Sequence, residues 1–122
     1  MRVELLRAKI HRARVTDANL DYVGSLSLCP RLVEAAGLYP YEKLAIYNVT
    51  NGERFETYLM PQDVAEGTVC INGAAAHLAR KGDIVIIAAY ASVEAPPSQA
   101  FKPRLVFVDQ ANKPVALHEV RA

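Results

Sequence analysis

Short runs rich in β-branched and aromatic residues, separated by Gly, Pro, Asn and Asp, follow one another along almost the whole chain. Such runs are typical of strands, and their close spacing favours a closed or packed β-structure. The predicted strands lie near 3–15, 25–29, 43–50, 53–60, 68–72, 84–93, 104–109 and 114–120. A chain of 122 residues can bury one core but not two, so we expect a single, mainly β domain over residues 1–122.

Helix is a minor component of this prediction. Pro30 and Gly37 stand at the two ends of a short run that is typical of a helix, and a second helical turn is predicted over residues 74–79. Asn51 and Gly52 lie between two strand runs. They are the pair that a two-residue hairpin turn favours, because both positions of that turn need a positive φ. We therefore predict one or two short helices and a tight hairpin.

The composition argues against nucleic acid, membranes and metal ions as binding partners. The chain has 14 Lys and Arg against 13 Asp and Glu, so no net field draws it to nucleic acid or to a membrane. Cys29 and Cys70 have neither metal-site spacing nor the density of a disulfide scaffold, and the three His complete no ligand set, so no metal is expected. The longest apolar run, 84–91, is far shorter than the roughly 20 residues that span a bilayer. We expect a soluble, cytoplasmic protein that acts on a small, locally charged substrate.

The dipeptide Gly24-Ser25 is a candidate site of self-cleavage. A serine hydroxyl held against the preceding carbonyl can attack it, and glycine leaves that carbonyl uncrowded. The products would be an ester, then dehydroalanine, and finally a ketone, so that Ser25 becomes an N-terminal pyruvoyl group. Gly-Ser pairs also occur in ordinary turns, and the dipeptide alone does not decide between the two interpretations.

A protein cut after Gly24 must hold its first 24 residues without a covalent link, and the strand near 3–15 can do so. Successive residues of a strand face opposite sides, so Leu6, Ala8 and Ile10 should be buried on one face. Lys9 and His11 then lie on the other face. For both of these side chains, simple exposure to solvent is the alternative to a role in a site.

The second strand of the hairpin carries a cation, a hydroxyl and a phenol within five residues, namely Arg54, Thr57 and Tyr58. Arg54 can bind a carboxylate through two hydrogen bonds, and Tyr58 can deliver a proton to a carbanion. Arg54 and Tyr58 share a face but stand about 13 Å apart on an ideal strand, whereas Thr57 faces the other way. The alternative is that Arg54 and Tyr58 serve only cross-strand pairing.

The segment that follows the strand near 68–72 is rich in small residues. Gly73, Ala74 and Ala75 allow backbone N–H groups to approach a ligand, and Asn72 can hold an oxyanion. The alternative is a turn at Asn72-Gly73 with alanines that pack a tight corner.

Taken in order and spacing, these motifs resemble the bacterial aspartate 1-decarboxylase family, small pyruvoyl-dependent enzymes that make β-alanine for pantothenate and coenzyme A. The resemblance covers nearly the whole chain and rests on segments 9–12, 21–25, 51–54, 57–58, 72–77, 82–83, 103–109 and 112–114. It implies a double-psi β-barrel and a homotetramer with active sites between subunits. Two positions depart from the family pattern: Cys29 stands where an acidic residue is expected, and Tyr47 stands where some members carry tryptophan.

The resemblance also implies a role for each candidate residue. Ser25 becomes the pyruvoyl cofactor and forms a Schiff base with L-aspartate, which then loses its α-carboxylate as CO2. Tyr58 protonates the resulting carbanion, and Lys9 and Arg54 hold the carboxylates. Thr57 contacts substrate and polarises the Gly24 carbonyl during self-cleavage.

Further residues complete the implied pocket. The backbone groups of Gly73, Ala74 and Ala75 line it, and His11, Tyr22 and Asn72 shape it. Two other functions stay open on the sequence: a pyruvoyl enzyme for a different amino acid, and a non-catalytic β-barrel module that binds a ligand or partner. Whether cleavage is spontaneous or needs a maturation factor is also open.

Overall fold

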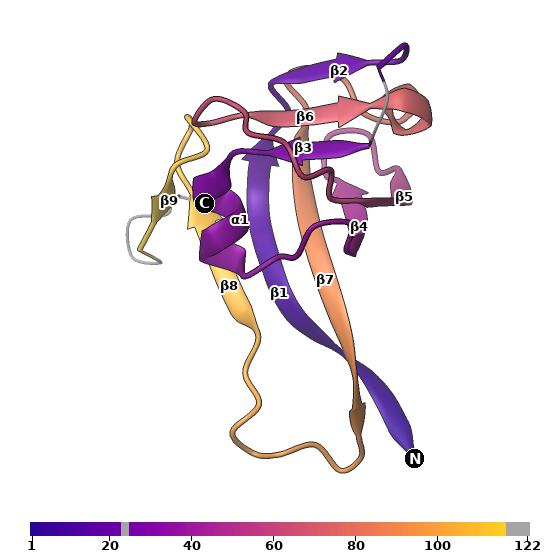
Figure 1. Cartoon of the computed structure of the whole chain (residues 1–122), viewed down its shortest axis with the longest axis vertical. Coiled ribbons are helices and arrows are strands. Elements are labelled where there is room, and N and C mark those ends of the chain that lie inside the picture. The colour runs from indigo at the N-terminus through magenta and orange to yellow at the C-terminus, as the bar shows by residue number, and fades with distance from the viewer. Residues whose placement is uncertain (23–24, 117–122) are drawn as a thin grey trace.

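The structure is a computed structural model, and it describes residues 1–22 and 25–116 (Figure 1). Gly24 lies outside the described residues, as does most of the strand predicted near 114–120. The strands are β1 (Arg2–Arg14), β2 (Asp17–Asn19), β3 (Leu26–Leu28), β4 (Lys43–Asn48), β5 (Arg54–Tyr58), β6 (Val69–Asn72), β7 (Ile84–Glu94), β8 (Arg104–Val108) and β9 (Pro114–Val115). The helices are α1 (Pro30–Ala36) and a single 3₁₀ segment, η1 (Gly73–His77). The mainly β prediction is confirmed, and β2 is the strand that it missed.

The strands form two sheets. The larger has six strands in the order β5-β4-β7-β1-β8-β9, and the smaller has three in the order β2-β6-β3. Both sheets are mixed, because β1 pairs in parallel with β8 and β2 pairs in parallel with β6. The long antiparallel pair β1 and β7 runs through the molecule, and its far end projects beyond the body together with the loop that leads to β8 (Figure 1).

Strand β1 contributes to the core through alternation of its side chains, interrupted by two shifts in its pairing with β7, the first of them between Leu6 and Ala8. Ala8 and Ile10 are buried as predicted, Leu6 is half-buried nearer the projecting end, and Lys9 and His11 face the other way. The pairing of β1 with β7 shifts between Ile10 and Ala13. That shift returns Ala13 to the buried face, so the strand keeps contributing to the core after the bulge.

The predicted helix is confirmed at both ends. Pro30 occupies its first turn, where a missing N–H costs nothing, and Gly37 follows it with φ of 67°. The Gly37 N–H donates to Glu34 O at 3.1 Å, which satisfies a carbonyl that the helix leaves open. The two fully buried helix residues, Leu32 and Ala36, face the core. The second predicted helical turn is η1, which begins at Gly73 rather than at residue 74.

The β4–β5 hairpin is confirmed, but its predicted two-residue turn is wrong. The strands end at Asn48 and begin again at Arg54, and of the Asn51-Gly52 pair Gly52 alone has a positive φ, 79°. The reason is the Asn48 side chain, whose Oδ1 accepts from the Thr50 N–H at 3.0 Å and widens the turn. The Gly52 N–H then donates to Asn48 O at 2.8 Å.

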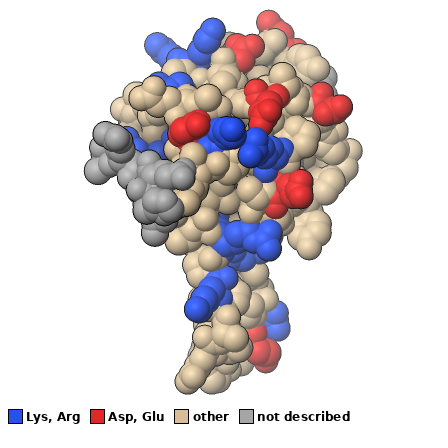
Figure 2. All heavy atoms as spheres, turned by 90° about the vertical axis from the view of Figure 1, so that its left-hand side faces the viewer, with Lys and Arg blue, Asp and Glu red and all other residues tan. Residues whose placement is uncertain are grey.

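The surface carries both signs of charge. Acidic and basic side chains are interspersed over the body on the face shown in Figure 2. Among the described residues, no helix has the length and apolar character that crossing a membrane requires.

Candidate active site

Ser25 lies immediately before β3 and is held by two neighbouring strands. Its side chain Oγ donates to the carbonyl of Tyr58 at 3.0 Å, at the end of β5. Its own carbonyl accepts from the Asn72 N–H at 2.7 Å, at the end of β6. The residue is 8% exposed. Ser25 is therefore fixed at both its hydroxyl and its backbone, directly after a peptide bond that lies outside the described residues.

A hollow of about 430 Å³ opens beside this serine. It forms where β3, β5 and the corner between β6 and η1 meet. The predicted site residues among those that line it are Ser25, Thr57, Tyr58, Asn72, Ala74 and Ala75. These residues are brought together from three separate parts of the sequence, as the motifs predicted.

The corner between β6 and η1 differs from the tightly packed alternative. Ala74 is exposed, and Ala75 is half-buried beside the hollow. Gly73 begins η1 with a φ of 65°, a backbone conformation that suits glycine. The side chain of Asn72 is held by Cys70, whose Sγ donates to Asn72 Oδ1 at 3.2 Å. Burial, and then the nearby Asp17 carboxylate, raise the pKa of the Cys70 thiol, so this donor keeps its proton.

Three further residues line the same hollow and were missed by the sequence reasoning: Phe55, Glu56 and Leu78. Glu56 lies between Arg54 and Tyr58 on the exposed face of β5. Because alternate residues of a strand share a face, the sequence could have placed Glu56 beside these two candidates. Among the described residues that line the hollow, Glu56 is the one with a charged side chain. A dicarboxylate bound beside Ser25 would thus meet no cation from this lining.

Arg54 lies in an adjacent hollow of about 550 Å³. Its guanidinium carbon is 5.1 Å from the centre of the Tyr47 ring, on the neighbouring strand β4. The two hollows share Phe55 and Glu56, so they adjoin along β5. The predicted alternation is confirmed, because Thr57 is buried while Arg54 and Tyr58 are exposed. Neither of these two hollows is lined by both Arg54 and Ser25.

Lys9 and His11 are not among the residues that line the hollow at Ser25, and they lie on the face of β1 opposite Ala8 and Ile10. Lys9 pairs with Ala88 of β7 and is half-buried, and His11 pairs with Phe107 of β8. The His11 ring meets the Phe107 ring edge-on at 5.5 Å, and its Nδ1 is buried with no hydrogen-bond partner among the described residues. Burial, and then the charges of Lys9 and Arg12, lower the pKa of His11 below 6.5.

Tyr22 lines a third hollow, of about 400 Å³, that shares Asn72 with the one at Ser25. Half of the Tyr22 surface is exposed. Its expected part in shaping the site stays a prediction.

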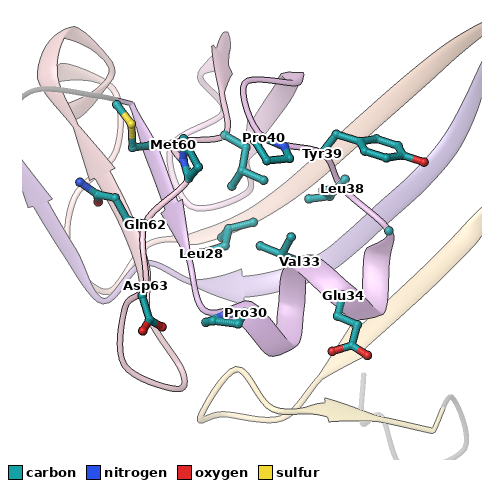
Figure 3. A pocket seen from close by; sticks show the side chains of 13 residues that line it. Leu28, Pro30, Val33, Glu34, Leu38, Tyr39, Pro40, Met60, Gln62 and Asp63 are labelled. Carbon is teal, nitrogen blue, oxygen red and sulfur yellow. The ribbon is translucent and has the colours of Figure 1, made fainter.

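A larger hollow, of about 620 Å³, is separate from this chemistry. In Figure 3, Val33 of α1, Leu38, Pro40 and Leu28 face it, and the carboxylates of Glu34 and Asp63 lie at its rim. None of the predicted site residues lines it. The candidate active site is the smaller hollow, because it contains the nucleophile and the proton donor that the motifs predicted.

Comparison with known proteins identifies the family of the chain. The family model described as aspartate decarboxylase matches residues 1–115. The chain belongs to the aspartate decarboxylase family. The fold of that family is the double-psi β-barrel, and the mainly β architecture with one α-helix fits it.

Similar members of the family cover almost the whole chain. The aspartate 1-decarboxylase of Caldicellulosiruptor bescii is 50% identical over 98% of this chain and 93% of its own length. That of Campylobacter jejuni strain 81-176 is 53% identical over 92% and 88%. That of Syntrophus aciditrophicus is 53% identical over 89% and 94%.

The described residues do not form a recognisable metal site. They include no group of three His, Cys, Asp or Glu side chains that could hold a metal ion. They fit a pyruvoyl group better, because the backbone of Ser25 is held by Asn72 and its side chain faces Tyr58 at the wall of a hollow.

Proposed function

We propose that this chain is an aspartate 1-decarboxylase that converts L-aspartate to β-alanine and CO2. The observation that carries the proposal is the position of Ser25, whose hydroxyl and carbonyl are both held at the wall of a hollow that Tyr58 and Thr57 also line. The names of the similar proteins support the reaction. The reactant and products are small soluble metabolites, which supports a cytoplasmic setting.

The chain would first cut itself between Gly24 and Ser25, giving fragments 1–24 and 25–122. The Ser25 hydroxyl attacks the Gly24 carbonyl, the amide nitrogen leaves that carbon, and an ester forms. Elimination then releases Gly24 as a carboxylate and leaves dehydroalanine at residue 25. Water hydrolyses its imine tautomer, ammonia departs, and a pyruvoyl group remains. The carbonyl of Tyr58 accepts a hydrogen bond from the Ser25 hydroxyl and so orients it, and Thr57, which lines the same hollow, would polarise the Gly24 carbonyl.

The pyruvoyl group supplies an electrophilic carbonyl that accepts the electron pair left when the α-carboxylate departs as CO2. Side chains and backbone groups of the chain bind the substrate and supply the proton. Tyr58 donates a proton to the α-carbon of the substrate, Asn72 and the backbone at Ala74 and Ala75 orient it, and Thr57 contacts it. Gly73, which lies between Asn72 and Ala74 at the start of η1, would add its backbone groups.

Lys9 and Arg54 would hold the two carboxylates of aspartate. In the described chain they lie outside the hollow at Ser25, which carries Glu56 as its one charged lining residue. We therefore propose a homotetramer in which a neighbouring copy completes each site. His11, on β1, and Tyr22, in the hollow that shares Asn72 with the one at Ser25, would shape the completed pocket.

Mass spectrometry of the purified protein tests the proposal. Wild-type protein should yield a fragment that ends at Gly24 and a larger fragment with a ketone at residue 25. Ser25→Ala should stay whole and inactive, whereas the control Ser27→Ala, in the same short strand, should still be cleaved. A whole chain even after co-expression in a native host, which would supply a maturation factor, would overturn the proposal in favour of a non-catalytic binding module.

Tyr58→Phe tests the proton donor. The variant keeps the backbone carbonyl that holds Ser25, so it should process normally. Loss of the phenol should lower kcat by about 10²- to 10⁴-fold, the range that general acid catalysis supplies. Normal turnover in fully processed Tyr58→Phe would remove this role from Tyr58. Assays with other amino acids would show whether aspartate is the preferred substrate.

A further inference from the structure

We propose that Tyr90 is a positioning residue for Arg54, acting through the ring of Tyr47. This inference rests on the proposed function in one respect: it takes Arg54 to be a carboxylate-binding residue. The three side chains form a row across strands β5, β4 and β7. The Tyr47 ring lies against the Arg54 guanidinium, 5.1 Å from ring centre to Cζ, and the hydroxyls of Tyr47 and Tyr90 are 2.6 Å apart.

The strand register explains how two tyrosines so far apart in sequence meet. Tyr47 pairs with Arg54 on one side and with Ile86 on the other. Tyr90 lies four residues further along β7, which is about 13 Å on an ideal strand. Ala45 and Ala88 form the cross-strand pair between them, and their methyl side chains leave room for two long phenols to lean toward each other. A larger pair at this register position would keep the hydroxyls apart.

The Tyr47 ring contacts the guanidinium of Arg54 and leaves the N–H groups of that guanidinium free to bind a carboxylate. The ion pairs of the described residues do not include Arg54, and the nearby Glu56 is engaged by Lys43, with Nζ 3.1 Å from Oε2. A carboxylate on Arg54 would compete with the substrate, whereas an aromatic face leaves the guanidinium N–H groups available. Contact with a ring orders the long side chain better when the ring itself is held, and Tyr90 supplies that hold.

The contact between the two phenols is independent of pH over the working range of an enzyme. The hydrogen bond to Tyr47, followed by burial, raises the pKa of Tyr90 to about 12. Glu4 acts in the same direction, and Arg54 opposes it. Tyr90 thus stays protonated near neutrality, and the row of side chains keeps one arrangement.

Steady-state kinetics of Tyr90→Phe test the inference. Removing one hydroxyl should raise KM for aspartate by about three- to tenfold, with kcat changed by less than about twofold and self-cleavage complete. Tyr47→Phe should behave alike, and the double variant should be no worse than either single one, because both changes break the same contact. Tyr41→Phe, an exposed phenol elsewhere, is the matched control and should leave both constants unchanged.

A rescue separates positioning from a general loss of stability. Tyr47→Trp supplies a larger π face that binds a cation more strongly, so it should restore the wild-type KM in the Tyr90→Phe background. Unchanged KM in Tyr90→Phe, additive losses in the double variant, or failure of Trp to rescue would each overturn the inference.

The mobility of Arg54 gives a readout that does not depend on activity. In ¹⁵N-arginine-labelled protein, the Nε–Hε signal of Arg54, assigned from its loss in Arg54→Lys, should lose order and shift in Tyr90→Phe but not in Tyr41→Phe. An unaltered signal would contradict the positioning role. If wild-type protein makes no β-alanine while this signal changes as expected, the proposed function fails and the inference about Arg54 stands.

Discussion

His11 shows how the environment of one side chain couples stability to pH. Its ring edge lies against Phe107 and its Nδ1 is buried with no partner among the described residues, so protonation would place a charge where nothing accepts its hydrogen bond. The positive charges of Lys9 and Arg12 would repel a protonated His11 and lower its pKa further. The folded-state pKa lies below 6.5, so the unfolded chain binds the proton more tightly and the neutral imidazole favours the folded state.

The predicted consequence is a loss of stability on acidification. The contribution of His11 should be complete above pH 6.5 and should be lost as the pH falls through the lowered folded-state pKa. We expect His11→Gln, which does not titrate, to unfold with a flatter pH dependence than its parent over this window. Denaturant unfolding of uncleaved Ser25→Ala protein, with and without His11→Gln at one protein concentration, measures the difference. Parallel pH profiles of the two proteins would contradict it.

The sequence predicted which candidate residues lie together better for the uncharged ones than for the charged ones. Ser25, Tyr58 and Asn72 could be named from their chemistry, and the structure brings them together at one hollow, where β5 and β6 end and β3 is about to begin. Arg54 could be placed on the correct face of β5 but not in a site, since its surroundings depend on which strand lies beside it. The Tyr90 contact could not be predicted at all, because it follows from a register that no local pattern encodes.

At the scale of elements, strands with clear turn residues around them were predicted within one or two residues at most ends, as for β4 and β7. The short strand β2 was missed because its three residues, Asp17–Asn19, have low strand propensity. They pair in parallel with β6, so tertiary contacts decide their conformation. The hairpin turn was misjudged for a related reason, because the Asn48 side chain reshapes the loop.

The hairpin gives a prediction about backbone strain. Gly52 has a φ of 79°, and a Cβ added there would meet nothing within 4 Å, so strain is the whole cost of a side chain. Gly52→Ala should lower the free energy of unfolding by about 1–2 kcal/mol, the cost of the left-handed conformation for an L-residue. Gly52→Asn is the matched control and should cost less, because asparagine adopts this conformation more readily. Equal losses from denaturant unfolding of the two variants would show that the cost lies elsewhere.

At the scale of the whole molecule, the first segment of the chain belongs to both sheets. Strand β1 lies between β7 and β8 in the larger sheet, and β2 pairs with β6 in the smaller one. The mainly β class could be predicted from composition and turn residues. The division into two sheets could not, because parallel pairs such as β1 with β8 join segments almost a whole chain apart. This arrangement places the proposed cut at Gly24 after both strands.

We therefore predict that fragment 1–24 stays bound after cleavage. Size-exclusion chromatography of processed protein should give one species containing both fragments, which separate in denaturant alone. Ile10 is fully buried, and Ile10→Ala should lower the free energy of fragment release by about 2–5 kcal/mol. Leu5→Ala, on the half-buried part of the same strand, is the control and should lower it less. Loss of fragment 1–24 from wild-type protein on dilution in native buffer would mean that backbone pairing and the buried face of β1 do not suffice to hold it.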